Sequence, residues 1–232
     1  MPRKAVSRRD SLKLFGGLGL LALIPPACKA ASASTSDPLA CVARPSLTEG
    51  PYFVDEKLER SDLRSDPSDG TTRPGIPLEL TFVVQKLAGG QCAPLAGVLV
   101  DVWHCDATGS YSDVGSQKGK KYLRGYQVTD ANGLVKLVTI FPGWYQGRAI
   151  HIHFKLRTGP SAPTGFEFTS QLFFDETVAD TIYADAAYGG RGSADTSNAG
   201  DGIYSDGGSE LLLTPSKTAD GYAAKIVIGM EI

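Results

Sequence analysis

Apolar and polar residues alternate along several short segments of the chain, a pattern typical of half-buried β-strands. Residues 78–87 show it clearly, because Leu78, Leu80, Phe82 and Val84 fall on one face. The same pattern predicts further strands at 97–104, within 125–145 on both sides of an Asp-Ala-Asn-Gly turn, and at 149–156, 166–175 and 225–232. Gly, Pro, Asn and Asp separate these segments. We therefore expect an all-β fold, a β-sandwich of immunoglobulin or transthyretin type with long irregular loops.

The last of these segments is expected to place four apolar residues on one inward face: Ile226, Ile228, Met230 and Ile232. Helical spacing is scarce, and only residues 176–185 match a short helix. Residues 184–208 form a long polar stretch that we expect to be a loop, and long loops in compact domains are often functional. Residues 34–48 are polar and irregular and are interpreted as a leader. No repeat is found, so residues 34–232 are predicted to be one domain.

Residues 1–33 have the pattern of an export signal rather than of a folded element. Arg8 and Arg9 precede a short apolar run at 14–24, and small residues follow it. The arginine pair resembles a twin-arginine signal. The alternative is an ordinary secretory signal that happens to carry two arginines.

Export predicts a location in the periplasm or outside the cell. Cleavage after Ala30 and cleavage after Ala33 both fit the small residues there. Cys28 could instead carry a lipid, although the residues before it match that pattern poorly.

Composition and charge narrow the possible partners. The chain has 232 residues, of which 42% are hydrophobic, so it can bury a sizeable core. Its net charge is −2 and no basic patch is present, which argues against a nucleic-acid partner. Beyond the N-terminus no window approaches the roughly 18 apolar residues of a membrane span.

Three cysteines follow the signal: Cys41, Cys92 and Cys105. An exported chain tolerates disulfides. Cys92 and Cys105 flank one expected strand, so they lie too far apart to bridge each other. Cys41 is therefore the expected partner of one of them. No C-x-x-C motif occurs, which argues against a cysteine zinc site.

Two of the three histidines, His151 and His153, lie on alternate positions of one expected strand. Their side chains share a face with Lys155, about 7 Å apart along the backbone, while the apolar residues between them face the core. Two imidazoles at this distance can bind one metal ion. The alternatives are two solvent-facing histidines, or one histidine satisfied by a hydrogen bond in the core.

Two tyrosines are placed to complete such a metal site, whereas the third histidine is not. His104 falls on the valine face of its own strand, where a packed or hydrogen-bonded role is expected. Tyr145 precedes His151 by six residues, and Tyr111 lies just beyond the strand that ends near Trp103. Fe(III) favours phenolate oxygen, so two tyrosines beside two histidines point to iron.

Five segments in order within residues 41–210 read EGPYF, GVLVDVWHCDATGSYS, YLRGYQVTDANGLVKLVTIFPGWY, RAIHIHF and TSQLFFD. Together they resemble the intradiol ring-cleavage dioxygenases, most closely the protocatechuate dioxygenase branch and its short exported relatives. The resemblance implies a β-sandwich enzyme with one mononuclear non-haem Fe(III) held by two tyrosines and two histidines. In this sequence the implied ligands are Tyr111, Tyr145, His151 and His153.

The same resemblance implies a reaction. A catecholic substrate would bind the iron through both oxygens, O2 would attack the ring, and the bond between the two hydroxyl-bearing carbons would break. The product would be a muconate-type dicarboxylate. Tyr145 would leave the iron and accept a proton. Arg148 would support developing charge, and Gln171 would line the pocket; the alternatives are a surface arginine and a solvent-facing strand residue.

Two features depart from the larger members of that family. Only six positions separate Tyr145 from His151, so the pocket wall near residues 146–149 is expected to be trimmed. The N-terminal helical dimerisation segment of the catechol-type members is not found. The identity of the catechol and the oligomeric state are therefore left open.

Two alternative functions fit the same fold. The chain could be a transthyretin-like β-sandwich binding module with a catalytically silent metal site, although a decayed site is expected to lose its ligands first. It could also be an extradiol dioxygenase, but that class needs Fe(II) with two histidines and one carboxylate, and the tyrosines disfavour it.

Overall fold

The computed structural model describes residues 42–159 and 165–232, whose strands form two five-stranded sheets. The first sheet has the order β2-β1-β10-β9, and β5 also pairs with β1. Its strands are β1 (Pro77–Ala88), β2 (Gln91–Pro94), β5 (Leu134–Ile140), β9 (Ser216–Lys217) and β10 (Tyr222–Glu231). The second sheet has the order β4-β3-β6-β7-β8. Its strands are β3 (Val98–Trp103), β4 (Arg124–Val128), β6 (His151–Thr158), β7 (Glu167–Phe174) and β8 (Leu212–Leu213).

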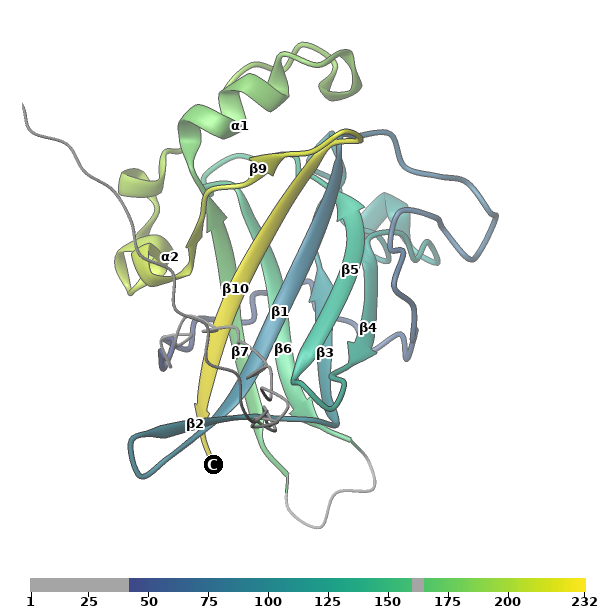
Figure 1. Cartoon of the computed structure of the whole chain (residues 1–232). Helices are drawn as coiled ribbons and strands as arrows, with labels where there is room; N and C mark the ends of the chain where they lie inside the picture. The colour runs from purple at the N-terminus through teal and green to yellow at the C-terminus, as the bar shows by residue number, and fades with distance from the viewer. Residues whose placement is uncertain (1–41, 160–164) are drawn as a thin grey trace, which may run out of the picture. The chain divides into compact units, whose positions relative to one another are not determined.

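The two sheets pack face to face, with β1, β5 and β10 in front of β3, β6 and β7 in Figure 1. The alternation predicted for residues 78–87 places Leu78, Leu80 and Phe82 in the core between them. The Phe82 ring meets that of Phe154 from β6, with ring centroids 5.5 Å apart. The predicted all-β sandwich is confirmed.

The Asp-Ala-Asn-Gly turn links the two sheets instead of closing a hairpin. It joins β4, which pairs with β3, to β5, which pairs with β1. Asp130 Oδ1 accepts hydrogen bonds from the backbone N–H groups of Asn132 and Leu134. Gly133 has φ +71°, and a Cβ there would lie 2.2 Å from the Val84 carbonyl oxygen. Only glycine fits this crossing point between the layers.

Three of the four residues predicted to face inward on the last strand are buried, and one is not. Ile226, Ile228 and Met230 are buried, but Ile232 is 46% exposed, so that part of the prediction is wrong. The pairing of β10 with β1 ends at Glu231, and Ile232 therefore lies beyond the sheet.

The predicted short helix is confirmed as α1 (Glu176–Tyr183), which begins where Asp175 accepts a hydrogen bond from the Val178 N–H. The long stretch after it is irregular but contains α2 (Gly202–Ser205). The described residues also contain short 3₁₀ helices: Gly115–Gln117, Ala186–Tyr188, Asn198–Gly200 and Gly208–Leu211.

The described part of the expected leader is held by both sheets. Gly229 of β10 donates its N–H to the Val42 carbonyl at 2.8 Å, and Leu47 donates its own to Thr169 of β7 at 3.0 Å. Residues 34–41 and the predicted signal at 1–33 lie outside the described residues. Within 42–159 and 165–232, no helix is long and apolar enough to cross a membrane.

Cys105 is a free thiol buried beside the Gly143 carbonyl, to which its Sγ donates at 3.4 Å. Burial raises the pKa of this thiol to about 12. Cys105 is therefore not the disulfide partner of Cys41, and that alternative is wrong. Cys41 lies outside the described residues, so a bridge from Cys41 to Cys92 stays a prediction.

Candidate metal centre

The two histidines of β6 project from the outer face of the second sheet but are not solvent-facing. His151 is 3% exposed and His153 is 1% exposed, while Ile152 and Phe154 between and after them enter the core. The solvent-facing alternative is therefore wrong.

Residues 45–58 cover this face of the sheet. The Phe53 ring packs on Trp103 with ring centroids 4.8 Å apart, and the Lys155 ammonium lies 4.0 Å from the centre of the Phe53 ring. Lys155 also forms ion pairs with Glu49 and Glu167. Phe53 and the paired Lys155 thus pack together beside Trp103, whose ring stacks on His153.

The four predicted ligands come together at one point. The Tyr145 hydroxyl lies 3.1 Å from His151 Nε2, and the Tyr111 hydroxyl lies 3.4 Å from the same nitrogen. The rings of His151 and His153 are nearly perpendicular, with centroids 4.8 Å apart. The Tyr111 ring lies 5.8 Å from that of Tyr145 and 6.2 Å from that of His153. Two phenols and two imidazoles thus converge from β6 and from the loops after β3 and β5.

A backbone contact fixes the tautomer of His151. Its Nδ1 lies 2.6 Å from the Ala149 carbonyl oxygen, which can only accept a hydrogen bond. Nδ1 therefore carries the proton, and the lone pair of Nε2 faces the two phenol groups. Metal-binding histidines are commonly oriented in this way.

His153 has no hydrogen-bond partner for either ring nitrogen among the described residues, although both atoms are buried. Buried polar atoms are nearly always paired, so an unpaired imidazole indicates a ligand such as an ion. The residues present therefore fit a metal ion, with His153 and Nε2 of His151 as nitrogen donors and the two phenols as oxygen donors.

Burial sets the protonation of the site in the absence of a cation. It lowers the pKa of His151 to about 3, with help from the Arg148 charge, and that of His153 well below the ordinary value. Both imidazoles are therefore neutral and able to bind a metal. Burial also raises the pKa of Tyr145 to about 12 and that of Tyr111 well above its usual range. Phenolate at neutral pH would need a strong positive charge close by.

Arg148 and Gln171 lie together beside this cluster. Arg148 Nη2 donates to Gln171 Oε1 at 2.7 Å, and its Nε donates to Asp201 Oδ2 at 2.9 Å. Gln171 is fully buried and lies opposite His153 in the register of β6 and β7. The alternatives of a surface arginine and a solvent-facing glutamine are both wrong.

Sequence reasoning missed three residues of this site. Asp201 comes from the predicted loop, Trp103 stacks on His153, and the Tyr52 ring lies 4.5 Å from that of Tyr111. The loop length, and the EGPYF segment that contains Tyr52, were the available signals. Neither signal indicates which residue reaches the site, because that depends on the path of the loop.

The third histidine has the structural role expected of it. His104 is fully buried, with Nε2 2.6 Å from the Thr139 hydroxyl and Nδ1 2.8 Å from the Cys105 carbonyl oxygen. Burial lowers its pKa to about 4.

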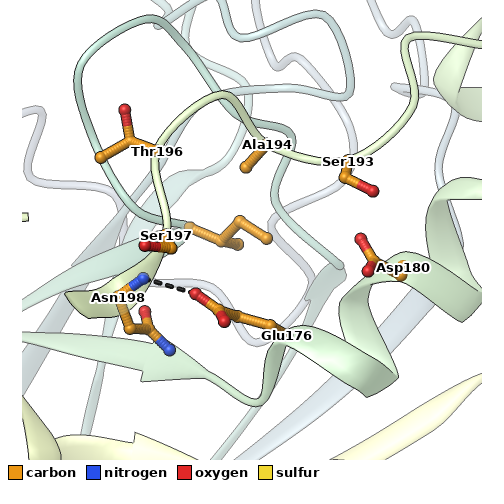
Figure 2. Close-up of a pocket in the computed structure, with 8 residues that line it drawn as sticks. Glu176, Asp180, Ser193, Ala194, Thr196, Ser197 and Asn198 are labelled. Atoms are coloured by element: carbon orange, nitrogen blue, oxygen red, sulfur yellow. Dashed lines mark hydrogen bonds between the residues drawn. The ribbon is translucent and has the colours of Figure 1, made fainter. Parts of the chain in front are cut away.

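Two cavities lie near the site. One, of about 260 Å³, is bordered by Tyr111 and Tyr145 together with Tyr52, residues 109–110 and residues 114–117. Figure 2 shows the other, of about 150 Å³, between α1 and residues 193–198. None of the predicted site residues lines this second cavity, although Ile150 next to His151 does.

No group of three or more His, Cys, Asp or Glu residues that could hold a metal occurs within 42–159 and 165–232. The two-histidine, one-carboxylate set of an extradiol enzyme is therefore not formed in this part of the chain. The hydroxyl oxygens of Tyr111 and Tyr145 lie 3.4 Å and 3.1 Å from His151 Nε2 instead.

Comparisons with known proteins identify the family of this chain. A family model described as Dioxygenase matches residues 48–197. A chlorocatechol 1,2-dioxygenase of Pseudomonas putida is 34% identical over 147 residues, which cover 55% of this chain and 52% of that protein. One from Pseudomonas sp. (strain P51) is 29% identical over 151 residues, 57% and 56% of the two chains. The chain thus spans about half the length of the curated relatives it matches.

Solved structures cover more of the chain. An intradiol ring-cleavage dioxygenase from Tetranychus urticae matches with a TM-score of 0.70 at 28% identity, over 82% of this chain and 95% of that one. The dioxygenase domain of a dioxygenase carbohydrate-binding protein fusion from Streptomyces sp. SirexAA-E matches with a TM-score of 0.60 at 29% identity, over 82% and 99%. With a family match over more than half of its length, this chain belongs to the intradiol ring-cleavage dioxygenase family.

Proposed function

We propose that this protein cleaves the ring of a catecholic compound with O2 at one non-haem Fe(III), and that the product is a muconate-type dicarboxylate. Tyr111, Tyr145, His151 and His153 would hold the iron. The observation that carries the proposal is the pair of buried, unpartnered ring nitrogens of His153 beside a His151 Nε2 that faces both phenols. A bound cation would pair with the lone-pair nitrogen of His153 and offset that part of the free-energy cost.

A catechol is the substrate class that the relatives support. Both curated relatives are named chlorocatechol 1,2-dioxygenase. Because this chain spans about half of their length, the proposal extends to the catechol ring and not to its substituents.

The iron would act as a Lewis acid and favour anionic oxygen ligands. The chain supplies the proton chemistry. Tyr145 is half-buried, and its pKa near 12 means that the free phenol holds a proton at neutral pH. A Tyr145 phenolate displaced by substrate would therefore take up a proton from the incoming catechol. Tyr111 is more deeply buried, which suits a ligand that stays in place.

Arg148 is the residue placed to stabilise negative charge. It is held beside the site by Asp201 and Gln171, and its charge partly opposes the effect of burial on the pKa values of Tyr111 and Tyr145. A preorganised positive charge of this kind favours charge that develops on a substrate in a water-poor site.

Oxygen uptake with a panel of catechols tests the proposal. We expect uptake with at least one catechol and an ultraviolet-absorbing muconate without a yellow product. A yellow product would indicate extradiol cleavage. Iron or another metal retained without any oxygen uptake would instead support the silent binding module.

We also propose that residues 1–33 direct export of the chain. The support is the arginine pair followed by an apolar run and small residues. Fractionation of cells that express the full chain should place it outside the cytoplasm, and replacement of Arg8 and Arg9 by lysine should retain it inside if the signal is of the twin-arginine type.

A further inference from the structure

The guanidinium of Arg148 is held from two sides. Its Nε donates to Asp201 Oδ2 at 2.9 Å, and its Nη2 donates to Gln171 Oε1 at 2.7 Å. Gln171 is fixed in turn, because its Nε2 donates to the Thr48 carbonyl at 2.8 Å. Among the described residues, Nη1 of Arg148 has no hydrogen-bond partner. Two fixed contacts thus orient the guanidinium and leave one amino group available.

The buried carboxylate of Asp201 accepts further hydrogen bonds from the backbone. It is 2% exposed, and Oδ2 also accepts the Ala149 N–H at 2.8 Å, while Oδ1 accepts the N–H groups of Ile203 and Tyr204. Burial by itself would raise the pKa of Asp201, but the hydrogen bonds from Ala149 and Arg148 hold it below the ordinary value. Asp201 is therefore charged and makes four hydrogen bonds in one place.

The loop that carries Asp201 makes several contacts with the segment that carries Tyr145 and Arg148. Trp144 Nε1 donates to the Gly192 carbonyl at 3.1 Å, and the Gly147 N–H donates to Asp195 at 3.3 Å. The Arg191 guanidinium lies 4.2 Å from the centre of the Trp144 ring. Together with Asp201, these contacts attach the loop along residues 144–149.

The same loop is anchored to α1 on its other side. The Asn198 N–H donates to Glu176, as Figure 2 shows. The Asn198 side-chain amide donates to the Phe174 carbonyl at 2.9 Å. The position of Asp201 is therefore set by the sheet and by α1.

From this arrangement we infer that Asp201 is a positioning residue, which acts on the reaction by fixing the guanidinium of Arg148. The inference rests on the proposed ring cleavage, and it assigns a role in the active site to a loop that contains none of the predicted ligands. Asp201 acts through Arg148, so its effect on turnover should disappear when Arg148 is absent.

A double-mutant cycle on the iron-loaded full chain tests this dependence. Asp201→Asn keeps an oxygen for the α2 N–H groups but removes the charge and one acceptor that Arg148 and Ala149 share. We expect it to lower kcat by about 10²-fold, the usual scale for a misplaced active-site group. In the Arg148→Leu background, Asp201→Asn should cause no further loss. Losses that multiply would overturn the inference, as would a kcat unchanged by Asp201→Asn alone.

A matched control separates this role from helix capping. Asp175 begins α1 as Asp201 begins α2, but the side-chain partners of Arg148 among the described residues are Asp201 and Gln171. Asp175→Asn should leave kcat unchanged. The unfolding midpoint of this variant measures how much stability is lost when a helix-capping aspartate loses its charge.

Hydrogen exchange gives a readout that does not need turnover. The Arg148 Nε–H and the Ala149 backbone N–H should exchange slowly in the unmodified protein and at least tenfold faster in Asp201→Asn, while Asp175→Asn leaves both unchanged. Equal exchange in Asp201→Asn and the unmodified protein would refute the positioning role. If no catechol is turned over at all, the proposed function fails, and the exchange rates still decide whether Asp201 fixes Arg148.

Discussion

The indole ring of Trp103 lies parallel to the imidazole of His153, with ring centroids 5.0 Å apart and an angle of 7° between the planes. The two residues are direct neighbours in the register of β3 and β6. A stacked indole limits rotation of the imidazole out of its plane, and both ring nitrogens of His153 lie in that plane. The sheet thus orients an imidazole that has no hydrogen-bond partner among the described residues.

Gly50 lies close to the same imidazole and offers a test. Its φ is +70°, and a Cβ there would lie 3.2 Å from His153 Cε1. Gly50→Ala should therefore displace His153 and lower the iron content that survives dialysis against a chelator. Gly89→Ala is the matched control, because Gly89 also has positive φ (+58°) but has no other atom within 4 Å of its Cβ position. Both variants should lose about 1 kcal/mol of stability to backbone strain. Equal iron retention in the two variants would contradict the position assigned to His153.

His104 predicts part of the pH dependence of stability. Burial lowers its pKa in the folded protein to about 4, against about 6.5 in the unfolded chain. Between these values the unfolded chain binds a proton that the folded chain does not, so stability falls as the pH is lowered. His104 should account for a loss of about 2 kcal/mol between pH 7 and pH 5. Urea unfolding of His104→Gln at both pH values should show a pH dependence that is weaker by this amount; an unchanged dependence would mean that His104 titrates normally.

We predict a disulfide bridge between Cys41 and Cys92 in the exported protein. Peptide mapping without reduction should find these two cysteines linked, while Cys105 reacts with alkylating reagents only after unfolding. Closing a loop of this length contributes about 2–4 kcal/mol, so reduction should lower the free energy of unfolding by that amount. Rapid alkylation of Cys41 and Cys92 in the native, unreduced protein would disprove the bridge.

Alternation in the sequence predicted the strands and their inward faces, because each strand has one face in the core. It could not predict that the turn at residues 130–133 crosses between sheets, since alternation indicates which face is buried and not which strand is the neighbour. Ile232 kept the pattern of β10 but lies past the end of its pairing with β1. Pattern alone therefore overestimates the length of a strand whose partner has ended.

Some residues of the candidate site could be predicted from the sequence, and others could not. His151 and His153 follow from strand periodicity, and the two tyrosines from the chemistry of iron and from the family resemblance. Asp201 does not follow from either, because it reaches Arg148 from a position 53 residues away along an irregular path. The stack of Trp103 on His153 requires the register of β3 and β6, which only the assembled sheet provides.

The central claim is that phenol oxygens and imidazole nitrogens of this cluster bind iron, and the visible absorption of the iron-loaded chain tests it most directly. Phenolate bound to Fe(III) absorbs visible light, whereas histidine and carboxylate ligands alone do not, so the protein should be red-brown. A catechol added without oxygen should shift the band to longer wavelength. Tyr111→Phe should lose the iron and all turnover. Tyr145→Phe should keep most of the iron and bind catechol more slowly. Tyr126→Phe on β4 is the control and should keep the visible band. A colourless protein that holds zinc, or a Tyr111→Phe variant with full iron and full activity, would contradict the account.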